Sequence, residues 1–392
     1  MRIGIDVRPL LQNYHRFRGI GYYTYNLIRN IGKIDTENEY ILFASENANG
    51  VDLNIMHNKF WKEEYQTPRI KKPVRLANHL QWLWDRLFLP RVISNSKIDI
   101  FHATDNNSIP ISHSCKVIAT IYDLIPCIFP KHYFNSLKTL DLRYNYYRQL
   151  AAAKKSAMII TISEYSKKDI MRILHVSEEK IKVIYLAANE KFKPIKDNQI
   201  LEKVKAKYNI NRPFALYVGG FDYRKNVERL IKSFYLFSQQ STEDLQLVIG
   251  GCIGNKIALE LKQLISLLNL KEKIVLPGFI ADRDLPAMYS AAELLIFPSL
   301  YEGFGLPVLE AMACGTPVIC SNTSSLSEVA GDAAILVNPY DEEEIAQAMK
   351  RVLSNPDLRE KMKRKGLERA KLFSWEQTAK KTLKVYQGVV RA

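Results

Sequence analysis

Two glutamates, Glu302 and Glu310, flank a glycine-rich bend in the segment YEGFGLPVLEAMACGTPVI, where a helix is predicted to begin. Gly303 and Gly305 allow backbone N–H groups to face a ligand, and Pro307 suits the first helical position. A carboxylate only accepts hydrogen bonds, so it suits sugar hydroxyls and is a poor partner for phosphate. The spacing therefore indicates two carboxylates that contact hydroxyls on two different rings with a diphosphate between them. The alternative is an exposed Glu302 and a Glu310 that the helix dipole favours.

A second candidate phosphate site lies in the segment YVGGFDYRKNVERLI. Gly219 and Gly220 end a predicted strand, and Arg224 and Lys225 precede a predicted helix. Two cations beside a helix N-terminus suit a diphosphate. The spacing differs from that of a Walker A loop, and a solvated basic turn is the alternative.

A third candidate, Gly19 with Gly21, lies between the first predicted strand and a helix. Glycines at this place let a phosphate or a sugar approach the helix N-terminus. Because the spacing is not G-x-G-x-x-G, a nicotinamide site is poorly supported. An ordinary loop between a strand and a helix is the alternative.

The elements that must position these residues alternate along the chain. Apolar runs of strand length are separated by helical patterns, which predicts parallel sheets covered on both faces. A lysine-rich polar stretch interrupts the alternation, so we predict two doubly wound domains in series. The predicted parts are an N-terminal domain over residues 1–188, a linker over 189–212, a C-terminal domain over 213–372, and a C-terminal helix over 373–392 that packs on the N-terminal domain.

The composition is globular and basic. The chain has 392 residues, 47% of them hydrophobic, and a formal net charge of +15. A basic surface attracts nucleic acid, anionic lipid or phosphorylated small molecules, although a solvated surface is an equal alternative. The five cysteines form no C-x-x-C pair, which favours a reducing, cytosolic location. No apolar run reaches the roughly 20 residues that span a bilayer, so we expect any membrane contact to be peripheral.

The opening segment, preceded by LLIFPS, resembles the signature of retaining, nucleotide-sugar-dependent glycosyltransferases of family 4. Further segments occur in that family's order and extend the resemblance over nearly the whole chain: GIGYYTYNLI, TIYDLIP, TISEYSKKDI, YVGGFDYRKN and SLSEVAGDAAILVNPYD. The resemblance implies the α/β fold called GT-B, in which two Rossmann-like doubly wound domains face a central cleft. Its nearest subgroup contains mannosyltransferases and related enzymes of bacterial surface polysaccharide assembly.

The resemblance also implies roles for individual residues. Glu302 would contact the donor sugar, Glu310 the ribose and Lys225 the diphosphate. Gly220 stands where the family usually has an arginine, and Arg224 is its candidate substitute. The residues assigned to donor binding are Gly19, Gly21, Gly219, Gly220, Arg224, Lys225, Gly278, Phe279, Glu302, Gly303, Phe304, Gly305, Leu306 and Glu310.

One departure concerns the reacting carbon. Many relatives have His-Asp where this chain has Tyr122 and Asp123, and a tyrosine is not cationic near neutral pH. Either Tyr122 forms a hydrogen bond in the site, or Asp123 dominates, or His102 serves instead, with a structural role as the alternative for that histidine. The catalytic candidates are therefore Glu302, Asp123, Tyr122 and His102.

We expect neither a cofactor nor an essential metal, because the sequence has no H-E-x-x-H, no Cys/His cluster and no D-x-D pair between a strand and an open loop. Cations and helix N-termini would then stabilise the departing diphosphate. The segment 68–93 mixes basic and aromatic side chains. It is predicted either to lie on an anionic membrane or to form a core helix with a basic outer face.

The function predicted from the sequence is transfer of a hexose from a nucleotide sugar to a polysaccharide or a lipid-linked oligosaccharide, with mannose from GDP-mannose as the first candidate. We expect a cytoplasmic protein, with peripheral contact at the inner face of the cell membrane. The alternatives are another enzyme on the same fold, such as a phosphorylase or a nucleotide-sugar epimerase, or a non-catalytic nucleic-acid-binding protein.

Overall fold

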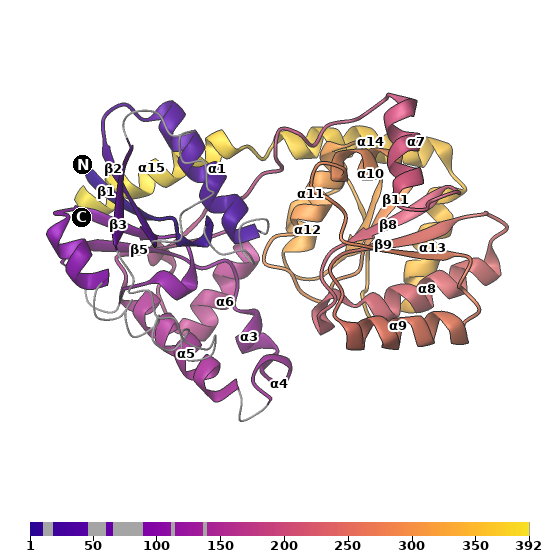
Figure 1. The fold of residues 1–392 in the computed structure, drawn as a ribbon, viewed down its shortest axis with the longest axis horizontal. Helices are drawn as coiled ribbons and strands as arrows, with labels where there is room; N and C mark the ends of the chain where they lie inside the picture. The colour runs from indigo at the N-terminus through magenta and orange to yellow at the C-terminus, as the bar shows by residue number, and fades with distance from the viewer. Residues whose placement is uncertain (11–18, 46–59, 66–88, 111–113, 136–138, 392) are drawn as a thin grey trace. The chain divides into compact units, whose positions relative to one another are not determined.

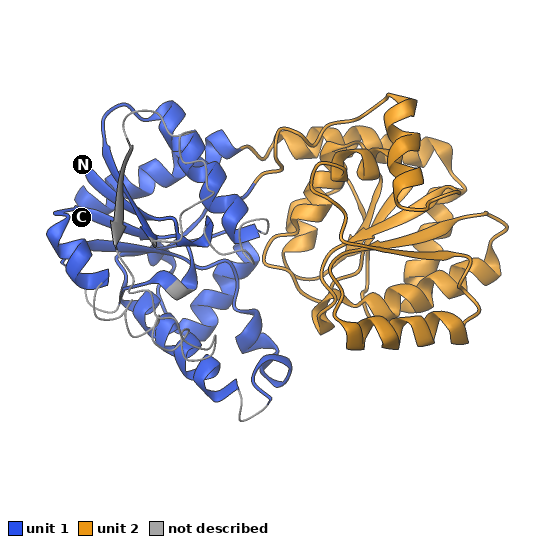
Figure 2. Ribbon diagram, viewed as in Figure 1, with its two compact units in different colours: residues 1–186, 375–392 blue, residues 187–374 orange. Residues whose placement is uncertain are grey.

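The computed structural model describes residues 1–391 apart from 11–18, 46–59, 66–88, 111–113 and 136–138 (Figure 1). The chain divides into two compact units (Figure 2). Unit 1 comprises Met1–Leu186 and Trp375–Ala392, and unit 2 comprises Ala187–Ser374.

Unit 1 is built on a parallel sheet with the strand order β3-β2-β1-β4-β5-β6-β7. Its strands are β1 (Arg2–Asp6), β2 (Glu39–Ser45), β3 (Phe60–Tyr65), β4 (Ile100–Ala103), β5 (Lys116–Thr120), β6 (Met158–Thr161) and β7 (Ile181–Val183). Its helices are α1 (Gly19–Ile34), α3 (Ile125–Ile128), α4 (Pro130–Tyr133), α5 (Leu140–Lys155), α6 (Glu164–Leu174) and α15 (Trp375–Arg391).

Unit 2 is built on a parallel sheet with the strand order β10-β9-β8-β11-β12-β13. Its strands are β8 (Phe214–Val218), β9 (Gln246–Gly250), β10 (Ile274–Gly278), β11 (Leu294–Phe297), β12 (Val318–Ser321) and β13 (Ile335–Val337). Its helices are α7 (Asn198–Lys207), α8 (Val227–Gln240), α9 (Asn255–Leu267), α10 (Leu285–Ala291), α11 (Leu306–Ala313), α12 (Ser325–Ala330), α13 (Glu342–Leu353) and α14 (Pro356–Lys371).

Both sheets reverse their strand order beside the first strand of the unit, between β1 and β4 and between β8 and β11. In open α/β sheets, ligands bind at the carboxyl ends of the strands at this switch point. The central strands are buried on both faces, which explains their continuous apolar runs. The topology therefore directs attention to the loops after β1, β4, β8 and β11.

The C-terminal helix α15 is part of unit 1. The Thr378 hydroxyl donates to the Tyr185 carbonyl oxygen at 2.7 Å, and the Tyr386 hydroxyl lies 2.6 Å from Nδ1 of His102. The Trp375 ring also lies against Tyr23, with 6.5 Å between ring centroids. These contacts hold the end of the chain on the unit in which the chain begins.

Two parts of the fold differ from the prediction. The segment 189–212, expected to be a linker, belongs to unit 2. There the Tyr208 hydroxyl, just after α7, donates to the Asp284 carboxylate at 2.7 Å and accepts from the backbone N–H of Ala281 at 3.0 Å. The edge strands β3 and β7 were not predicted, because FWKEEY is strongly charged and IKV is short. Among the described helices, none is long and apolar enough to cross a membrane.

Candidate active site

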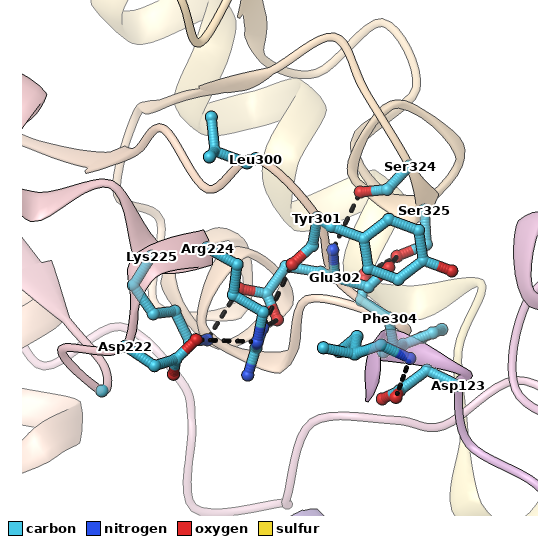
Figure 3. A network of polar contacts seen from close by, with 12 residues as sticks. Asp123, Asp222, Arg224, Lys225, Leu300, Tyr301, Glu302, Phe304, Ser324 and Ser325 are labelled. Atoms are coloured by element: carbon cyan, nitrogen blue, oxygen red, sulfur yellow. Dashed lines mark hydrogen bonds and ion pairs between the residues drawn. The ribbon is translucent and has the colours of Figure 1, made fainter. Parts of the chain in front are cut away.

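An ion network lies at the switch point of unit 2. Lys225 follows β8 in a short 3₁₀ turn, and its Nζ lies 2.7 Å from Oε1 of Glu302, which follows β11. Arg224 lies beside it, with Nη1 2.7 Å from Oε2 of the same carboxylate and 3.1 Å from the Tyr301 carbonyl oxygen. Figure 3 shows both cations directed at the Glu302 carboxylate. Three residues predicted from two separate motifs therefore meet at one place.

Burial and charge act in opposite directions on this network. Burial alone would raise the pKa of Glu302, but the charges of Lys225 and Arg224 lower it to about 2. Burial lowers the pKa of Lys225, although Glu302 counteracts this shift. The Glu302 carboxylate is therefore ionised at neutral pH. Asp222 completes the network from a more exposed position, 3.1 Å from Nε of Arg224.

Asn226 fixes the loop that carries the two cations. It has a left-handed backbone conformation with φ of 60°, which asparagine tolerates better than most residues. Its side-chain amide donates to the carbonyl oxygens of Pro298 at 3.0 Å and Pro339 at 2.7 Å. The side chain thereby ties the loop after β8 to the segments after β11 and β13.

Gly305 is required by the loop between Glu302 and α11. Its φ of 107° disfavours L side chains. A Cβ atom at this position would also lie 2.6 Å from Cδ2 of Leu326. The glycine precedes α11, which begins at Leu306, with Pro307 in its first turn. Gly303 and Phe304 are buried in the same loop, and the Phe304 ring packs edge-on against Phe373.

Two serines that the sequence analysis did not identify hold the Glu302 backbone. The Ser324 hydroxyl oxygen accepts from the backbone N–H of Glu302 at 3.0 Å. The Ser325 hydroxyl lies 2.8 Å from the Glu302 carbonyl oxygen and 2.9 Å from that of Phe304, so one proton serves two acceptors (Figure 3). Ser324 has a positive φ of 55°, which is uncommon for a residue other than glycine. The run SNTSS after a predicted strand was the available signal.

Glu310 lies in a different environment from Glu302. It lies on α11 and accepts a hydrogen bond from the Tyr289 hydroxyl on α10 at 3.0 Å. Burial raises the pKa of the Glu310 carboxyl group to about 7, although the Tyr289 bond partly offsets the shift. The two glutamates therefore differ in charge state near neutral pH, which suits different partners.

The predicted glycines after β8 and β10 lie in one row at the edge of the unit 2 sheet. The backbone N–H of Gly219 donates to the Gly250 carbonyl oxygen at 3.0 Å. The backbone N–H of Gly251 donates to the Gly278 carbonyl oxygen at 2.8 Å. The Gly220 carbonyl oxygen accepts from the Tyr217 hydroxyl at 2.7 Å. The Phe279 side chain, beside this row, is 62% exposed. An exposed aromatic ring of this kind can stack on a planar ligand.

In unit 1, Tyr122 and Asp123 follow β5, and both have local partners. The buried Tyr122 hydroxyl donates to the Thr104 carbonyl oxygen at 2.7 Å. Burial raises the pKa of Tyr122 well above its usual value, so its hydroxyl is neutral. The Asp123 carboxylate accepts from the backbone N–H of Ile125 at 3.1 Å. These contacts do not test the predicted catalytic roles.

The environment of His102 favours a structural role. The side chain is fully buried, with Nδ1 2.6 Å from the Tyr386 hydroxyl and Nε2 2.8 Å from the Thr120 hydroxyl. Burial lowers its pKa to about 3, so the ring is neutral. Both ring nitrogens are therefore engaged inside unit 1. These contacts support the structural alternative for this histidine, and they do not test the predicted catalytic role.

Gly19 and Gly21 form the first turn of α1. A Cβ atom at Gly19 would meet no atom within 4 Å, so packing does not require glycine there. Most of the segment 68–93, the predicted basic and aromatic stretch, lies outside the described residues. Within the described ranges, no group of three or more His, Cys, Asp or Glu side chains is arranged to hold a metal ion.

Comparisons with known proteins identify the family. The model described as "Glycosyltransferase Family 4" matches residues 17–191, and the model described as "Glycosyl transferases group 1" matches residues 200–369. The O-antigen chain mannosyltransferase B of Escherichia coli is 32% identical over 273 residues, which are 69% of this chain and 70% of that protein. The chain belongs to glycosyltransferase family 4. The enzyme class predicted from the sequence, a glycosyltransferase, is thereby confirmed.

Two further comparisons bear on length and fold. The serotype-specific mannosyltransferase WbdA of Escherichia coli is 29% identical over 67% of this chain, and the match spans only 32% of that protein. The structure of the Anabaena protein HepE in complex with UDP-glucose matches 99% of this chain and 100% of its own, with a TM-score of 0.75 and 15% identity. It confirms the predicted GT-B class of fold. These relatives do not favour a phosphorylase, an epimerase or a nucleic-acid-binding protein.

Proposed function

We propose that this glycosyltransferase moves mannose from GDP-mannose, with retention of configuration, onto a glycan or a lipid-linked glycan of a bacterial surface polysaccharide. The observation that carries the proposal is the network of Lys225, Arg224 and Glu302 at the unit 2 switch point. The names of two relatives, an O-antigen chain mannosyltransferase and a serotype-specific mannosyltransferase, support the sugar and the acceptor class.

The charges of the network suggest how the donor binds. Lys225 and Arg224 are balanced by Glu302 and Asp222. An incoming diphosphate would therefore replace carboxylate partners of the two cations. The same exchange would release Glu302 oxygens to accept hydrogen bonds from the hydroxyls of the donor sugar. Glu310 would accept from the ribose, and the cations would stabilise the departing diphosphate without a metal.

Fewer observations bear on the identity of the acceptor than on that of the donor. A lipid-linked glycan at the cytoplasmic face of the membrane would bring its reacting hydroxyl to a peripheral enzyme. A glycan free in solution would need no membrane contact. Of the catalytic candidates after β5 in unit 1, we expect Asp123 to contact the transferred sugar or the acceptor, because the Tyr122 hydroxyl already donates to the Thr104 carbonyl oxygen.

A thermal-shift panel of GDP-mannose, UDP-glucose, an ADP-sugar and a TDP-sugar tests the donor. A ligand that binds only the folded protein raises its apparent melting temperature. We expect GDP-mannose to give the largest increase and to support transfer to a glycan acceptor. A larger increase with another nucleotide sugar contradicts the donor, and no increase with any member of the panel contradicts the proposed function.

A further inference from the structure

Helix α5 of unit 1 (Figure 1) has a buried apolar face and a separate stripe of exposed apolar side chains. One face packs into the unit, because Leu150 and Ala153 belong to its hydrophobic core. The other face carries Leu140, Tyr144 and Tyr147, which are 52%, 64% and 42% exposed. Their spacing of four and three residues places them in one stripe along the helix. None of the three belongs to the hydrophobic core of unit 1, although the Tyr147 ring lies against those of Phe134 and Tyr146.

Basic residues border the exposed stripe on both sides. At about 100° per residue, the exposed Arg143 and Lys154 lie on one side, and the exposed Lys155 lies on the other. Arg148 falls on the same side as Lys155, but Nε and Nη1 of its guanidinium are buried. The Arg143 guanidinium also lies over the Tyr147 ring, 5.9 Å from its centroid. Asp141 is the single acidic residue of α5, so the helix carries a formal charge of 4 − 1 = +3.

We propose that the exposed stripe of α5 docks on a membrane surface that contains anionic lipid. A helix that lies in the plane of a membrane has apolar side chains toward the acyl chains and Lys or Arg at its borders. Tyrosine is enriched at the level of the lipid headgroups, where one end of the ring is apolar and the other is polar. The stripe and its cationic borders match both requirements.

Charge favours a lipid surface over a second copy of the chain. A symmetric dimer through the stripe would bring the exposed cations Arg143, Lys154 and Lys155 of one α5 close to those of the other. Anionic headgroups compensate these charges instead, and each Lys or Arg near such a surface strengthens binding by about fivefold. The inference rests on the proposed function in one respect: a lipid-linked acceptor would bring the enzyme to a membrane surface.

Vesicle co-sedimentation of the full chain tests the inference without any turnover, so the proposed function and the docking surface can fail separately. The probes are vesicles of phosphatidylcholine alone and of phosphatidylcholine with about one third phosphatidylglycerol. We expect binding to the anionic vesicles, lost at high salt. Removing three border charges with Arg143→Gln, Lys154→Gln and Lys155→Gln should lower partitioning by about tenfold to a hundredfold.

A matched charge control uses α14 of unit 2. Lys361→Gln, Arg364→Gln and Lys371→Gln also remove three exposed positive charges, from a helix without an aromatic stripe. We expect this variant to retain nearly all its partitioning. If it loses as much as the α5 variant, net charge and not α5 explains binding, and the inference is overturned.

The double variant Leu140→Gln, Tyr144→Gln tests the apolar stripe. Glutamine is a good helix former, and the two substitutions remove no core side chain and do not change the net charge. We expect partitioning to fall at least about fivefold, with an unchanged melting temperature. Unchanged partitioning overturns the role of the stripe. A dimer in size-exclusion chromatography that this variant converts to a monomer also overturns the inference, because a second copy would then cover the stripe.

Discussion

The switch points of the two units have the same strand topology but different chemistry. In unit 1, Asp6 at the end of β1 forms a buried ion pair with Arg8, with 2.8 Å between Oδ1 and Nε. The Thr104 hydroxyl donates to the Asp6 carbonyl oxygen at 2.7 Å. In unit 2, the cations of one loop are paired with the carboxylate of another, beside glycines. Strand order therefore gives the place of a site, and the residues that follow the strands determine what it does.

The two ion pairs also differ in what they connect. Asp6 and Arg8 are two residues apart, so their pairing does not depend on another strand. Lys225 and Glu302 come from loops after neighbouring strands β8 and β11. Removing a partner should therefore have different consequences in the two units: lower stability in unit 1, and lost ligand binding in unit 2.

Removing the cation in unit 2 should have the largest functional effect. Lys225→Met keeps much of the side-chain volume but removes the charge that we assign to the diphosphate. We expect transfer to fall by about 100-fold or more, because the departing diphosphate loses a cation. The measurement is the rate of mannosyl transfer at saturating acceptor. Lys232→Met on α8, at a half-buried lysine that pairs with Glu228, is the control and should leave the rate unchanged.

The matched change in unit 1 is Arg8→Met, which leaves the Asp6 carboxylate buried without its ion-pair partner. Breaking a buried pair in this way typically costs about 3 kcal/mol of stability. We expect the variant to melt earlier but still to show a thermal shift with GDP-mannose. A variant that keeps its stability and loses that shift would show that the unit 1 switch point also binds the donor.

The candidate glycines of the two units differ in how much their backbone conformation requires glycine. Gly305→Ala should lower the free energy of unfolding by about 2 kcal/mol, because φ is 107° and the new Cβ would clash with Leu326. Gly19→Ala in α1 should leave stability unchanged or raise it by about 0.5–1 kcal/mol. Chemical denaturation of the two variants measures both changes. Equal losses would mean that Gly19 is also needed by the fold.

Much of the architecture could be predicted because burial leaves a local pattern in the sequence. Helix α6 (Glu164–Leu174) and strand β8 (Phe214–Val218) are examples. Both have the apolar spacing of elements that pack on a core. The resemblance assigned Lys225 and Glu302 to one donor site, but their direct ion pair was not predicted. It forms because the loops after β8 and β11 end at the same edge of a parallel sheet.

The polar contacts between loops could not be predicted. The Ser325 hydroxyl holds two backbone carbonyl oxygens more than twenty residues earlier in the chain. Such bonds have no periodicity, and serines in a loop are equally typical of solvent-exposed turns. His102 shows the same limit. The sequence left a catalytic and a structural role open for this histidine, and only the fold shows that the Tyr386 hydroxyl of α15 lies against its ring.

Glu310 should make both stability and donor binding depend on pH. Its pKa is raised from 4.5 to about 7 in the folded protein, so the fold favours the protonated carboxyl. This group therefore lowers stability progressively as the pH rises from about 4.5 to about 7. We expect Glu310→Gln to gain about 1–2 kcal/mol relative to the wild type at about pH 8, and little at about pH 4. Urea unfolding at both pH values measures the difference.

Donor binding should change in the opposite direction. The ionised Glu310 carboxylate accepts hydrogen bonds from hydroxyls more strongly than the protonated group does. We therefore expect wild-type affinity for GDP-mannose to weaken as the pH falls below about 7, and that of Glu310→Gln to be weak at every pH. Affinity that is independent of pH in the wild type would contradict the ribose contact.

The smallest expected effect belongs to Tyr122 in unit 1. Its hydroxyl already donates to the Thr104 carbonyl oxygen, so Tyr122→Phe removes one buried hydrogen bond. We expect a loss of about 1 kcal/mol in the free energy of unfolding and less than about a threefold change in transfer. If transfer instead falls by about 100-fold with the same small loss of stability, the hydroxyl acts on the reacting sugar. Unit 1 would then supply a catalytic group as well as the structural contacts at its switch point. The residues after the strands of both units would in that case take part in the reaction.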